Sequence, residues 1–243
     1  MSFPSISIVV PARDEEKSIE PIIARMPKFP GKTEIIFVEG HSTDRTLDEI
    51  KRVSAKYASV FDISYAVQDG IGKANAVWKG FSLAKNDIIV ILDGDMTVLP
   101  EELIKFYETA AKNPNSFING TRLVYKMERG AMRFINYLGN KFFAIFLSLI
   151  IRQKITDTLC GTKGIYYKHF QKINYSGLLQ KIDDPFCDFT LLLAADRLGL
   201  KIIEVPVNYR KRIYGGTKIR RFKDGWKLLK IALRAKKVFS KLT

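Results

Sequence analysis

Two hydrophobic patterns alternate over the first hundred residues of this 243-residue chain. Short apolar runs rich in β-branched residues predict buried strands at 5–10, 34–38, 63–67 and 87–92. Apolar residues at helical spacing predict helices around 19–26, over 46–57 and from the loop 69–73 through 83. Strands that are apolar on both faces and alternate with helices favour an α/β fold, with a mostly parallel sheet flanked by helices.

The pattern changes after Pro100. It predicts further strands at 116–120, 164–167 and 201–207, and helical regions over 132–151 and 178–198. No repeat, low-complexity segment or obvious linker interrupts the chain. We therefore expect one domain over residues 1–215, followed by a basic amphipathic helix over 216–243.

Basic residues concentrate at the C-terminal end. The chain has 40 Lys and Arg against 25 Asp and Glu, a formal charge of +15, and residues 201–243 alone carry 14 basic and two acidic residues. A nearly balanced body with a basic end indicates a polyanionic partner, either lipid headgroups or nucleic acid. A solvated basic face would give the same composition.

Signals for compartment and membrane insertion are few. Two cysteines, Cys160 and Cys187, provide no disulfide framework and favour a reducing compartment. The N-terminal residues lack the pattern of a signal peptide, and the longest apolar run, 142–151, is too short to span a bilayer. We expect a cytoplasmic protein that associates peripherally with the cytoplasmic face of a membrane.

Polar side chains cluster at three predicted strand ends, within 13–15, 39–44 and 93–95. Ligands of parallel sheets bind beyond the carboxyl ends of the strands. Asp93 and Asp95 directly follow a buried strand, and two carboxylates one residue apart can converge on Mg²⁺ or Mn²⁺, which also binds diphosphate oxygens. In another position the same residues would indicate only a turn.

Several ordered motifs resemble those of the family 2 glycosyltransferases, which have the GT-A fold. They are VVPARDEE, FVEGHSTDRT, GIGKANAVWKGF and ILDGDMTVLP. The resemblance implies a Rossmann-like sheet, a nucleoside diphosphate sugar as donor, and a divalent metal held by Asp93 and Asp95. The donor-binding positions that it implies are Pro11, Ala12, Glu15, Glu39, Lys73, Asp93 and Gly94. The chain departs from the family's V-D-D-G-S segment, because Glu39, Gly40 and His41 replace Asp, Asp and Gly.

Later segments resemble the polyprenyl-phosphate sugar synthases, of the dolichol-phosphate mannose or glucose synthase kind. NGTRLVYKMERGAMRFINYLGNKFF is similar to their G-S-R segment and the helices after it, and TDTLCGTKGIYY to their acceptor loop. RIYGGTK matches their R-x-x-G-E-S-K loop in part, since Gly216 and Thr217 replace Glu and Ser. The resemblance implies that Arg212 and Lys218 neutralise the diphosphate leaving group.

The acceptor of those synthases is a lipid phosphate, which is ionised at neutral pH and needs cationic positioning more than a general base. Arg122 and Arg133 are candidates for holding this phosphate, although surface solubility explains them equally well. Asp188 lies where saccharide-forming relatives carry a catalytic base; here it acts as a catalytic residue, orients the acceptor or pairs with a basic residue. Asp157 is expected to be structural in the acceptor loop.

The C-terminal segment places Phe222, Trp226 and Leu229 at helical spacing opposite a very basic face. This pattern is typical of an interfacial helix on anionic lipid. A helix that docks on the protein's own core would show the same apolar face.

These features together predict an inverting, metal-dependent transfer of hexose from GDP- or UDP-hexose to a polyprenyl phosphate at an anionic membrane surface, with or without a separate membrane-anchoring subunit. Two alternatives remain. One is a saccharide or glycolipid hydroxyl as acceptor, with Asp188 as base. The other is a non-enzymatic nucleic-acid-binding module, which the absence of a recognised nucleic-acid motif disfavours.

Overall fold

The structure, a computed structural model, describes residues 3–125, 128, 131–132, 134–175, 184, 186–214, 226–231 and 233–234. Five residues named in the sequence analysis lie outside the described residues: Arg133, Gly216, Thr217, Lys218 and Phe222. Most of the segment 216–243 lies outside them too. The division into residues 1–215 and 216–243 therefore stays a prediction.

The described residues form one seven-stranded sheet in the order β3-β2-β1-β4-β6-β5-β7. The strands are β1 (Ile6–Ala12), β2 (Thr33–Glu39), β3 (Asp62–Val67), β4 (Ile88–Ile91), β5 (Ser116–Thr121), β6 (Lys163–Tyr166) and β7 (Lys201–Pro206). All pairs are parallel except those of β6, which runs antiparallel to both β4 and β5. Every predicted strand is present to within two residues, and the predicted mostly parallel sheet is confirmed.

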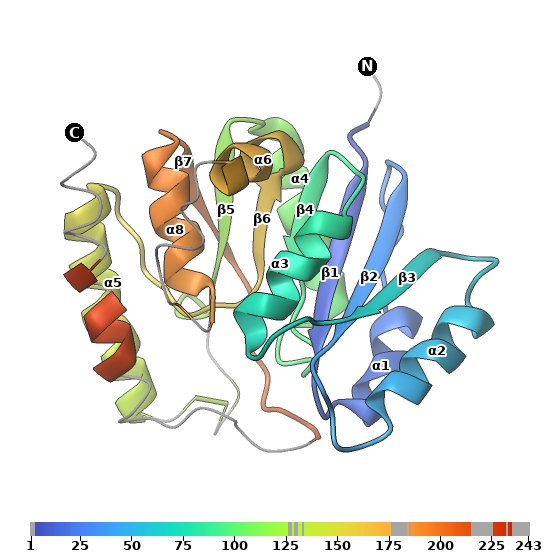
Figure 1. The fold of residues 1–243 in the computed structure, drawn as a ribbon. Coiled ribbons are helices and arrows are strands. Elements are labelled where there is room, and N and C mark those ends of the chain that lie inside the picture. The colour runs from blue at the N-terminus through green and yellow to red at the C-terminus, as the bar shows by residue number, and fades with distance from the viewer. Residues whose placement is uncertain are drawn as a thin grey trace.

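Helices cover both faces of the sheet (Figure 1). They are α1 (Glu16–Ala24), α2 (Thr46–Lys56), α3 (Lys73–Leu83), α4 (Leu103–Lys112), α5 (Phe134–Ile151), α6 (Tyr167–Tyr175) and α8 (Asp188–Arg197), with a 3₁₀ turn η1 (Pro100–Glu102) before α4. The buried residues of α1, α2 and α4 belong to one apolar cluster, and those of α3, α5, α6 and α8 belong to another.

Strand residues divide between these two clusters by the alternation of the pleat. In β1, Ile8 and Val10 join the cluster of α1, α2 and α4, whereas Val9 joins the cluster of α3 and α8. All three are fully buried. The central strands are therefore apolar on both faces because both faces are covered by helices.

The structure differs from the sequence prediction in three places. Helices α4 and α6 were not predicted, and β3 is largely exposed because it lies at the edge of the sheet. The predicted helical region 178–198 begins, within its described part, only at Asp188: Cys187 has a left-handed backbone with φ 65°, and Asp184 accepts the amide hydrogen bonds of Phe189 and Thr190.

Helix α5 lies at one end of the molecule with residues 226–231 near it (Figure 1). It buries Phe143 and Leu147 but exposes Ile145 and Leu149 by 65% and 75%. Within the described part of the chain, α5 is the one helix long and apolar enough to cross a bilayer by length and composition, and 28% of it is buried. It is longer than the run 142–151 on which the expectation of peripheral association rested.

The sequence left two alternatives for the C-terminal helix: an interfacial face or docking on the protein's own core. The helical residues 226–231 have features of both. Leu228 and Ile231 are buried in the cluster that contains the core of α5 and α8. Trp226 is 61% exposed. In this part of the C-terminal segment, one side docks on the protein and an aromatic side chain faces outward.

Two helical glycines provide a test of the packing. A Cβ at Gly80 in α3 would lie 2.3 Å from Cγ1 of Val9, whereas a Cβ at Gly139 in α5 would meet nothing within 4 Å. We expect Gly80→Ala to lower the free energy of unfolding by about 1–3 kcal/mol, because the helix must move off the sheet. Gly139→Ala, the matched control, should raise it by about 0.5–1 kcal/mol. Urea unfolding measures both, and equal stability of the two variants would contradict this packing.

Candidate functional site

The candidate site lies where β1, β2 and β4 end at the same edge of the sheet. The amide of Gly40 donates to the carbonyl of Ala12 over 2.8 Å, which ties the end of β2 to that of β1. The turn after β4 packs against β1, because a Cβ at Gly94 would lie 3.0 Å from the carbonyl oxygen of Pro11. Ala12 and the residues 93–95 are thereby brought together, as the parallel strands predict.

Asp93 forms a partly buried ion pair with Lys73, with 2.5 Å between Nζ and Oδ1. Lys73 is the first residue of α3, directly after Gly72, whose φ of 96° suits glycine. Burial alone would lower the pKa of Lys73, but the charges of Asp93 and Asp188 outweigh it and raise the pKa above its usual value. Lys73 is therefore a fixed cation at the edge of the sheet.

Asp95 binds both its own turn and a distant arginine. Its Oδ1 accepts hydrogen bonds from the amide and hydroxyl of Thr97 at 3.0 and 2.8 Å, and its Oδ2 accepts one from Nη2 of Arg212 at 2.6 Å. Burial pushes the pKa of Asp95 upward, but the charge of Arg212 and the hydrogen bonds from Thr97 prevail, so the pKa lies below its usual value. Arg212 also contacts Glu15, with 3.1 Å between Nη1 and Oε1.

Glu39 at the end of β2 holds the loop that follows it. Its two carboxylate oxygens accept hydrogen bonds from the amides of His41 and Ser42 at 3.1 and 2.5 Å. His41 has a left-handed backbone with φ 57°, a conformation that costs energy for residues other than glycine. Glu39 was expected to bind the base or ribose; in this structure its carboxylate orders the loop, and donor binding by it stays a prediction.

Asp188 lies in a buried charged cluster beside the Lys73–Asp93 pair. Its Oδ1 is 3.7 Å from Nζ of Lys163, and no hydrogen-bond partner for this oxygen exists among the described residues. Lys163 itself donates to Oδ1 of Asn119 at 2.7 Å. Burial raises the pKa of Asp188 to about 6 despite the opposing charges of Lys73 and Lys163.

The direction of β6 explains how this cluster reaches the site. Because β6 is antiparallel to β4, it begins at the edge where β4 ends. The residues before it pack tightly there: a Cβ at Gly161 would lie 2.1 Å from Oδ2 of Asp93 and 2.2 Å from Nζ of Lys73. Gly161 and Lys163 both lie within TDTLCGTKGIYY, the segment that resembles the acceptor loop. The sequence analysis did not place either of them beside the Lys73–Asp93 pair, because only tertiary contacts show this.

Arg122 and Asp157 form a second cluster, which Asn119 connects to Lys163 by donating to the carbonyl of Asp157 at 2.7 Å. Arg122 donates from Nε and Nη2 to the two carboxylate oxygens of Asp157 at 2.7 and 2.8 Å, and its guanidinium stacks 5.0 Å from the ring centre of Tyr209. Asp157 also accepts from Asn140 and from the amide of Leu159. Burial opposes ionisation of Asp157, but Arg122 lowers the pKa to about 2. This geometry supports a structural role for Asp157.

The structure thus brings most of the candidate residues together. Five of them are joined by ion pairs or lie at the same strand ends as the pairs: Glu15, Lys73, Asp93, Asp95 and Arg212. Pro11, Ala12, Glu39 and Gly94 border this group. Arg122 belongs to the Asp157 cluster. The acceptor roles of Arg122 and Arg133 stay predictions, as does the role of Lys218 at the diphosphate.

The donor set at Asp93 and Asp95 fits a divalent metal only in part. Among the residues that the structure describes, no group of three or more His, Cys, Asp or Glu side chains could hold a metal ion. Mg²⁺ is commonly bound by one or two carboxylates together with substrate phosphates and water. Two carboxylates on one turn fit that mode, with the remaining ligands supplied by the donor.

Comparison with known proteins identifies the family. The model of glycosyl transferase family 2 matches residues 7–176. The chain belongs to this family. It is therefore a glycosyltransferase, and the nucleic-acid-binding alternative is not supported.

Individual relatives are similar over different lengths. The chain is 32% identical to the dolichol-phosphate mannosyltransferase of Saccharomyces cerevisiae over 121 residues, which are 48% of this chain and 44% of that protein. It is 27% identical to the dolichyl-phosphate beta-glucosyltransferase of Trichomonas vaginalis over 94% of this chain and 73% of that one. It is 26% identical to the dolichol-phosphate mannosyltransferase of Pyrococcus furiosus over 88% and 59%. The chain spans less than two thirds of the yeast and Pyrococcus proteins.

Solved structures show the same fold. The glucosyl-3-phosphoglycerate synthase of Mycobacterium tuberculosis, solved with Mn²⁺, UDP and glucosyl-3-phosphoglycerate, superposes with a TM-score of 0.67 at 19% identity, over 96% of this chain and 80% of that one. The same enzyme with Mn²⁺ and UDP-glucose gives a TM-score of 0.67. The predicted GT-A-type fold is confirmed.

The buried Asp188 predicts a pH-dependent stability. A carboxyl whose pKa is raised to about 6 on folding binds its proton more tightly in the folded state, so stability falls as pH rises from about 4 to 6 and stays low above. Asp188→Asn cannot ionise and should exceed the wild type by up to about 3 kcal/mol at pH 7.5, with no difference near pH 3.5. Urea unfolding across pH measures this, and a pH-independent difference would contradict it.

Because Arg122 pairs with the buried Asp157, truncation of Arg122 should strongly lower the stability of the protein. Arg122→Ala leaves a fully buried carboxylate without its cation and should lower the free energy of unfolding by about 3–5 kcal/mol at pH 7. The double variant Arg122→Ala/Asp157→Asn should recover part of the loss. Chemical unfolding measures the stability of both variants. A decrease in the free energy of unfolding below about 1 kcal/mol in the single variant would show that the pair does not hold the loop.

Proposed function

We propose that this glycosyltransferase moves a hexose from a nucleoside diphosphate sugar to a polyprenyl phosphate. The observation that carries the proposal is the turn 93–95 at the end of β4, where Asp93 and Asp95 meet Lys73 and Arg212. Carboxylates for a metal and cations for phosphate oxygens are the groups that departure of a diphosphate requires. Two relatives that match over more than 90% of this chain are named as dolichyl-phosphate sugar transferases, the one from Trichomonas vaginalis and one from Haloferax volcanii, which supports the lipid phosphate as acceptor.

The donor diphosphate would bind over the turn, near Lys73 and Arg212. Bound Mg²⁺ or Mn²⁺, held by Asp93 and Asp95, would neutralise charge on the diphosphate. Arg212 now pairs with Asp95 and Glu15, so donor binding requires its guanidinium to share or exchange these partners. The fixed cation Lys73 would stabilise the negative charge that develops on the leaving group.

The acceptor phosphate would approach the anomeric carbon from the side opposite the diphosphate, which inverts the configuration. It is already ionised, so no residue needs to take a proton from it. Arg122, which fixes Asp157 and the loop after it, would act through the position of that loop, and Arg133 remains the candidate for direct phosphate contact. UDP and GDP donors are both compatible with this site.

One observation favours the alternative acceptor, a saccharide or glycolipid hydroxyl. Asp188 has a pKa of about 6 and an Oδ1 without a hydrogen-bond partner among the described residues. A carboxylate with a pKa near neutrality suits a general base, which a hydroxyl nucleophile requires. Asp188 is nevertheless only 5% exposed, and an acceptor would have to enter the buried cluster to reach it.

The proposed acceptor lies in a membrane, so the enzyme would work at the cytoplasmic face of an anionic bilayer. The basic C-terminal residues and the exposed apolar side of α5 support membrane contact. A separate membrane-anchoring subunit is compatible with this arrangement.

Asp95→Asn tests the donor site. The substitution keeps the size of the side chain but removes a metal-binding charge, so transfer of labelled hexose to polyprenyl phosphate should fall by about 10²–10³-fold or more. The Tm should stay near that of the wild type. Asp48→Asn, on the exposed side of α2, is the matched control and should keep full activity. Activity is measured as label extracted into organic solvent.

The same assay separates the two acceptors. Polyprenyl phosphate should accept the sugar whereas polyprenol and free saccharides should not, and Asp188→Asn should keep substantial activity with the phosphate. If Asp188→Asn instead lowers the rate by about 10²–10⁴-fold and abolishes a limb of the pH–rate profile, Asp188 is a general base and the acceptor is a hydroxyl. Full activity of Asp95→Asn in the presence of a chelator would refute the proposed metal site.

A further inference from the structure

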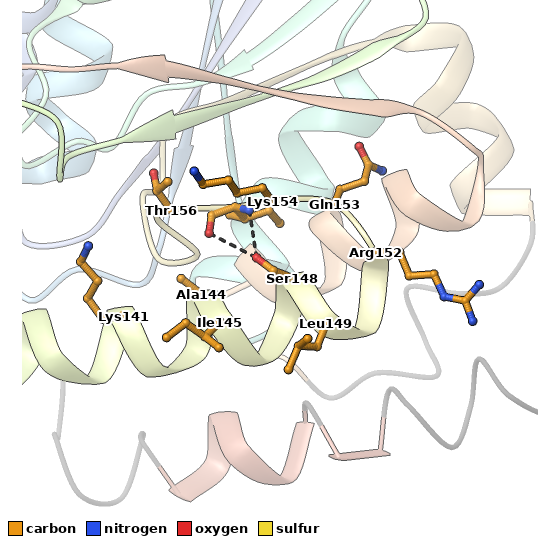
Figure 2. Close-up of a pocket in the computed structure, with 10 residues that line it drawn as sticks. Lys141, Ala144, Ile145, Ser148, Leu149, Arg152, Gln153, Lys154 and Thr156 are labelled. Carbon is orange, nitrogen blue, oxygen red and sulfur yellow. Dashed lines mark hydrogen bonds between the residues drawn. The ribbon is translucent and has the colours of Figure 1, made fainter.

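A groove outside the donor site runs between α5 and the segment 152–156 that follows it (Figure 2). Its volume is about 620 Å³. One wall consists of α5 residues and the other of the following loop: Lys141, Ala144, Ile145, Ser148, Leu149, Arg152, Gln153, Lys154, Ile155 and Thr156. A volume of this size can take a lipid headgroup and the first part of its chains.

The wall formed by the loop is held by specific hydrogen bonds. The hydroxyl of Ser148 accepts from the amide of Ile155 at 2.9 Å. Gln153 donates to the carbonyl of Leu200 at 3.1 Å and accepts from the amide of Ile202 at 2.9 Å. The amide of Thr156 donates to the carboxylate of Glu204 at 2.9 Å. The groove is therefore a formed feature that ligand binding need not order.

Three cations line this groove, and no acidic side chain does. Figure 2 shows Lys141 at one end, Arg152 at the other and Lys154 between them. None of the three forms an ion pair with a carboxylate within the described part of the chain. Two carboxylates lie behind the wall formed by the loop: Asp196, whose charge interacts with that of Arg152, and Glu204, which accepts from the amide of Thr156. Neither lines the groove, so the charges that face it are positive.

Arg152 occupies its place at an energetic cost. It has a left-handed backbone with φ 54° directly after the last residue of α5, where glycine is usual. A non-glycine residue in this conformation costs about 1–2 kcal/mol. Strain of this kind, at an exposed cation, points to a use for the side chain.

The apolar side of the groove continues into the exposed face of α5. Ile145 and Leu149 line the groove and point away from the sheet in Figure 2. Phe142 and Leu138 extend the same exposed face along the helix, at 54% and 50% exposure. Cations beside an exposed apolar helix face are the combination that binds an anionic bilayer surface.

We propose that this groove binds headgroups of anionic phospholipids, with Lys141, Arg152 and Lys154 spread along it as the cations that attract the phosphates, and with the exposed face of α5 lying in the bilayer interface. This phospholipid is neither donor nor acceptor. The inference deepens the proposed function in one respect, since it rests on the expectation that the enzyme works at a membrane.

The test measures binding of the full chain to phosphatidylcholine vesicles with and without phosphatidylglycerol, free of polyprenyl phosphate and donor. The triple variant Lys141→Gln/Arg152→Gly/Lys154→Gln should lose about fivefold in partition for each cation, and thus about a hundredfold, to phosphatidylglycerol vesicles. Arg152→Gly also relieves the backbone strain, so this single variant should keep or raise the Tm while losing about fivefold in partition.

The matched control removes the same charge elsewhere. Lys28→Gln/Lys32→Gln/Lys51→Gln changes exposed lysines that come from the region of α1, β2 and α2, at the other end of the molecule from α5 (Figure 1). This control should bind vesicles nearly as the wild type does. An equal loss in both triple variants, or equal partition of the wild type to the two kinds of vesicle, would overturn the proposal.

Two further measurements keep the outcome distinct from that of the proposed function. Turnover with a short, water-soluble polyprenyl phosphate should be unchanged in the groove variant, because none of its three residues belongs to the donor site. A wild type without any turnover would refute the proposed function and leave the vesicle result standing. If the groove variant loses thermal stabilisation by inorganic phosphate but keeps vesicle binding, the groove serves a soluble phosphate and the phospholipid proposal is refuted.

Discussion

The proposed donor site depends on the pairing of two carboxylates from one short turn with two cations from distant parts of the chain. Asp93 pairs with Lys73 at the start of α3, and Asp95 pairs with Arg212 after β7. Both carboxylates are partly buried, where an ion pair is screened less than at the surface. Docking of α3 and of the segment after β7 therefore favours this conformation of the turn after β4. This coupling joins the first and last parts of the chain at the point where the chemistry is proposed to occur.

Much of the fold could be predicted because its signals are local. Runs such as Ile88–Ile91 are apolar on both faces, and only a strand covered on both sides explains them. The antiparallel direction of β6 could not be predicted, because the periodicity of a strand is the same in either direction. That direction nevertheless decides the site, since it brings Gly161 and Lys163 to the end of β4.

Some residues of the candidate site could also be predicted from local motifs, and others could not. Asp93, Asp95 and Lys73 could be found because each lies in a short motif next to a strand end or helix start. The partners of Arg122 and Asp188 could not, because Arg122 meets a carboxylate 35 residues away and Asp188 meets Lys163, 25 residues before it in the chain. Burial sets the pKa of Asp188, and burial at that position depends on how α8 packs against the sheet.

Three glycines give the floor of the donor site an unusual property. A Cβ at Gly40, Gly94 or Gly161 would lie within 3.0 Å of Arg13, of the carbonyl of Pro11 or of Asp93, respectively. No residue larger than glycine fits at these three positions without a shift of the neighbouring atoms. Redesign of the enzyme for another nucleotide sugar must leave these positions alone and act through side chains that enter from the surrounding loops. The shape of the floor is set by the packing at the ends of the strands, and only the surrounding loops can vary in sequence.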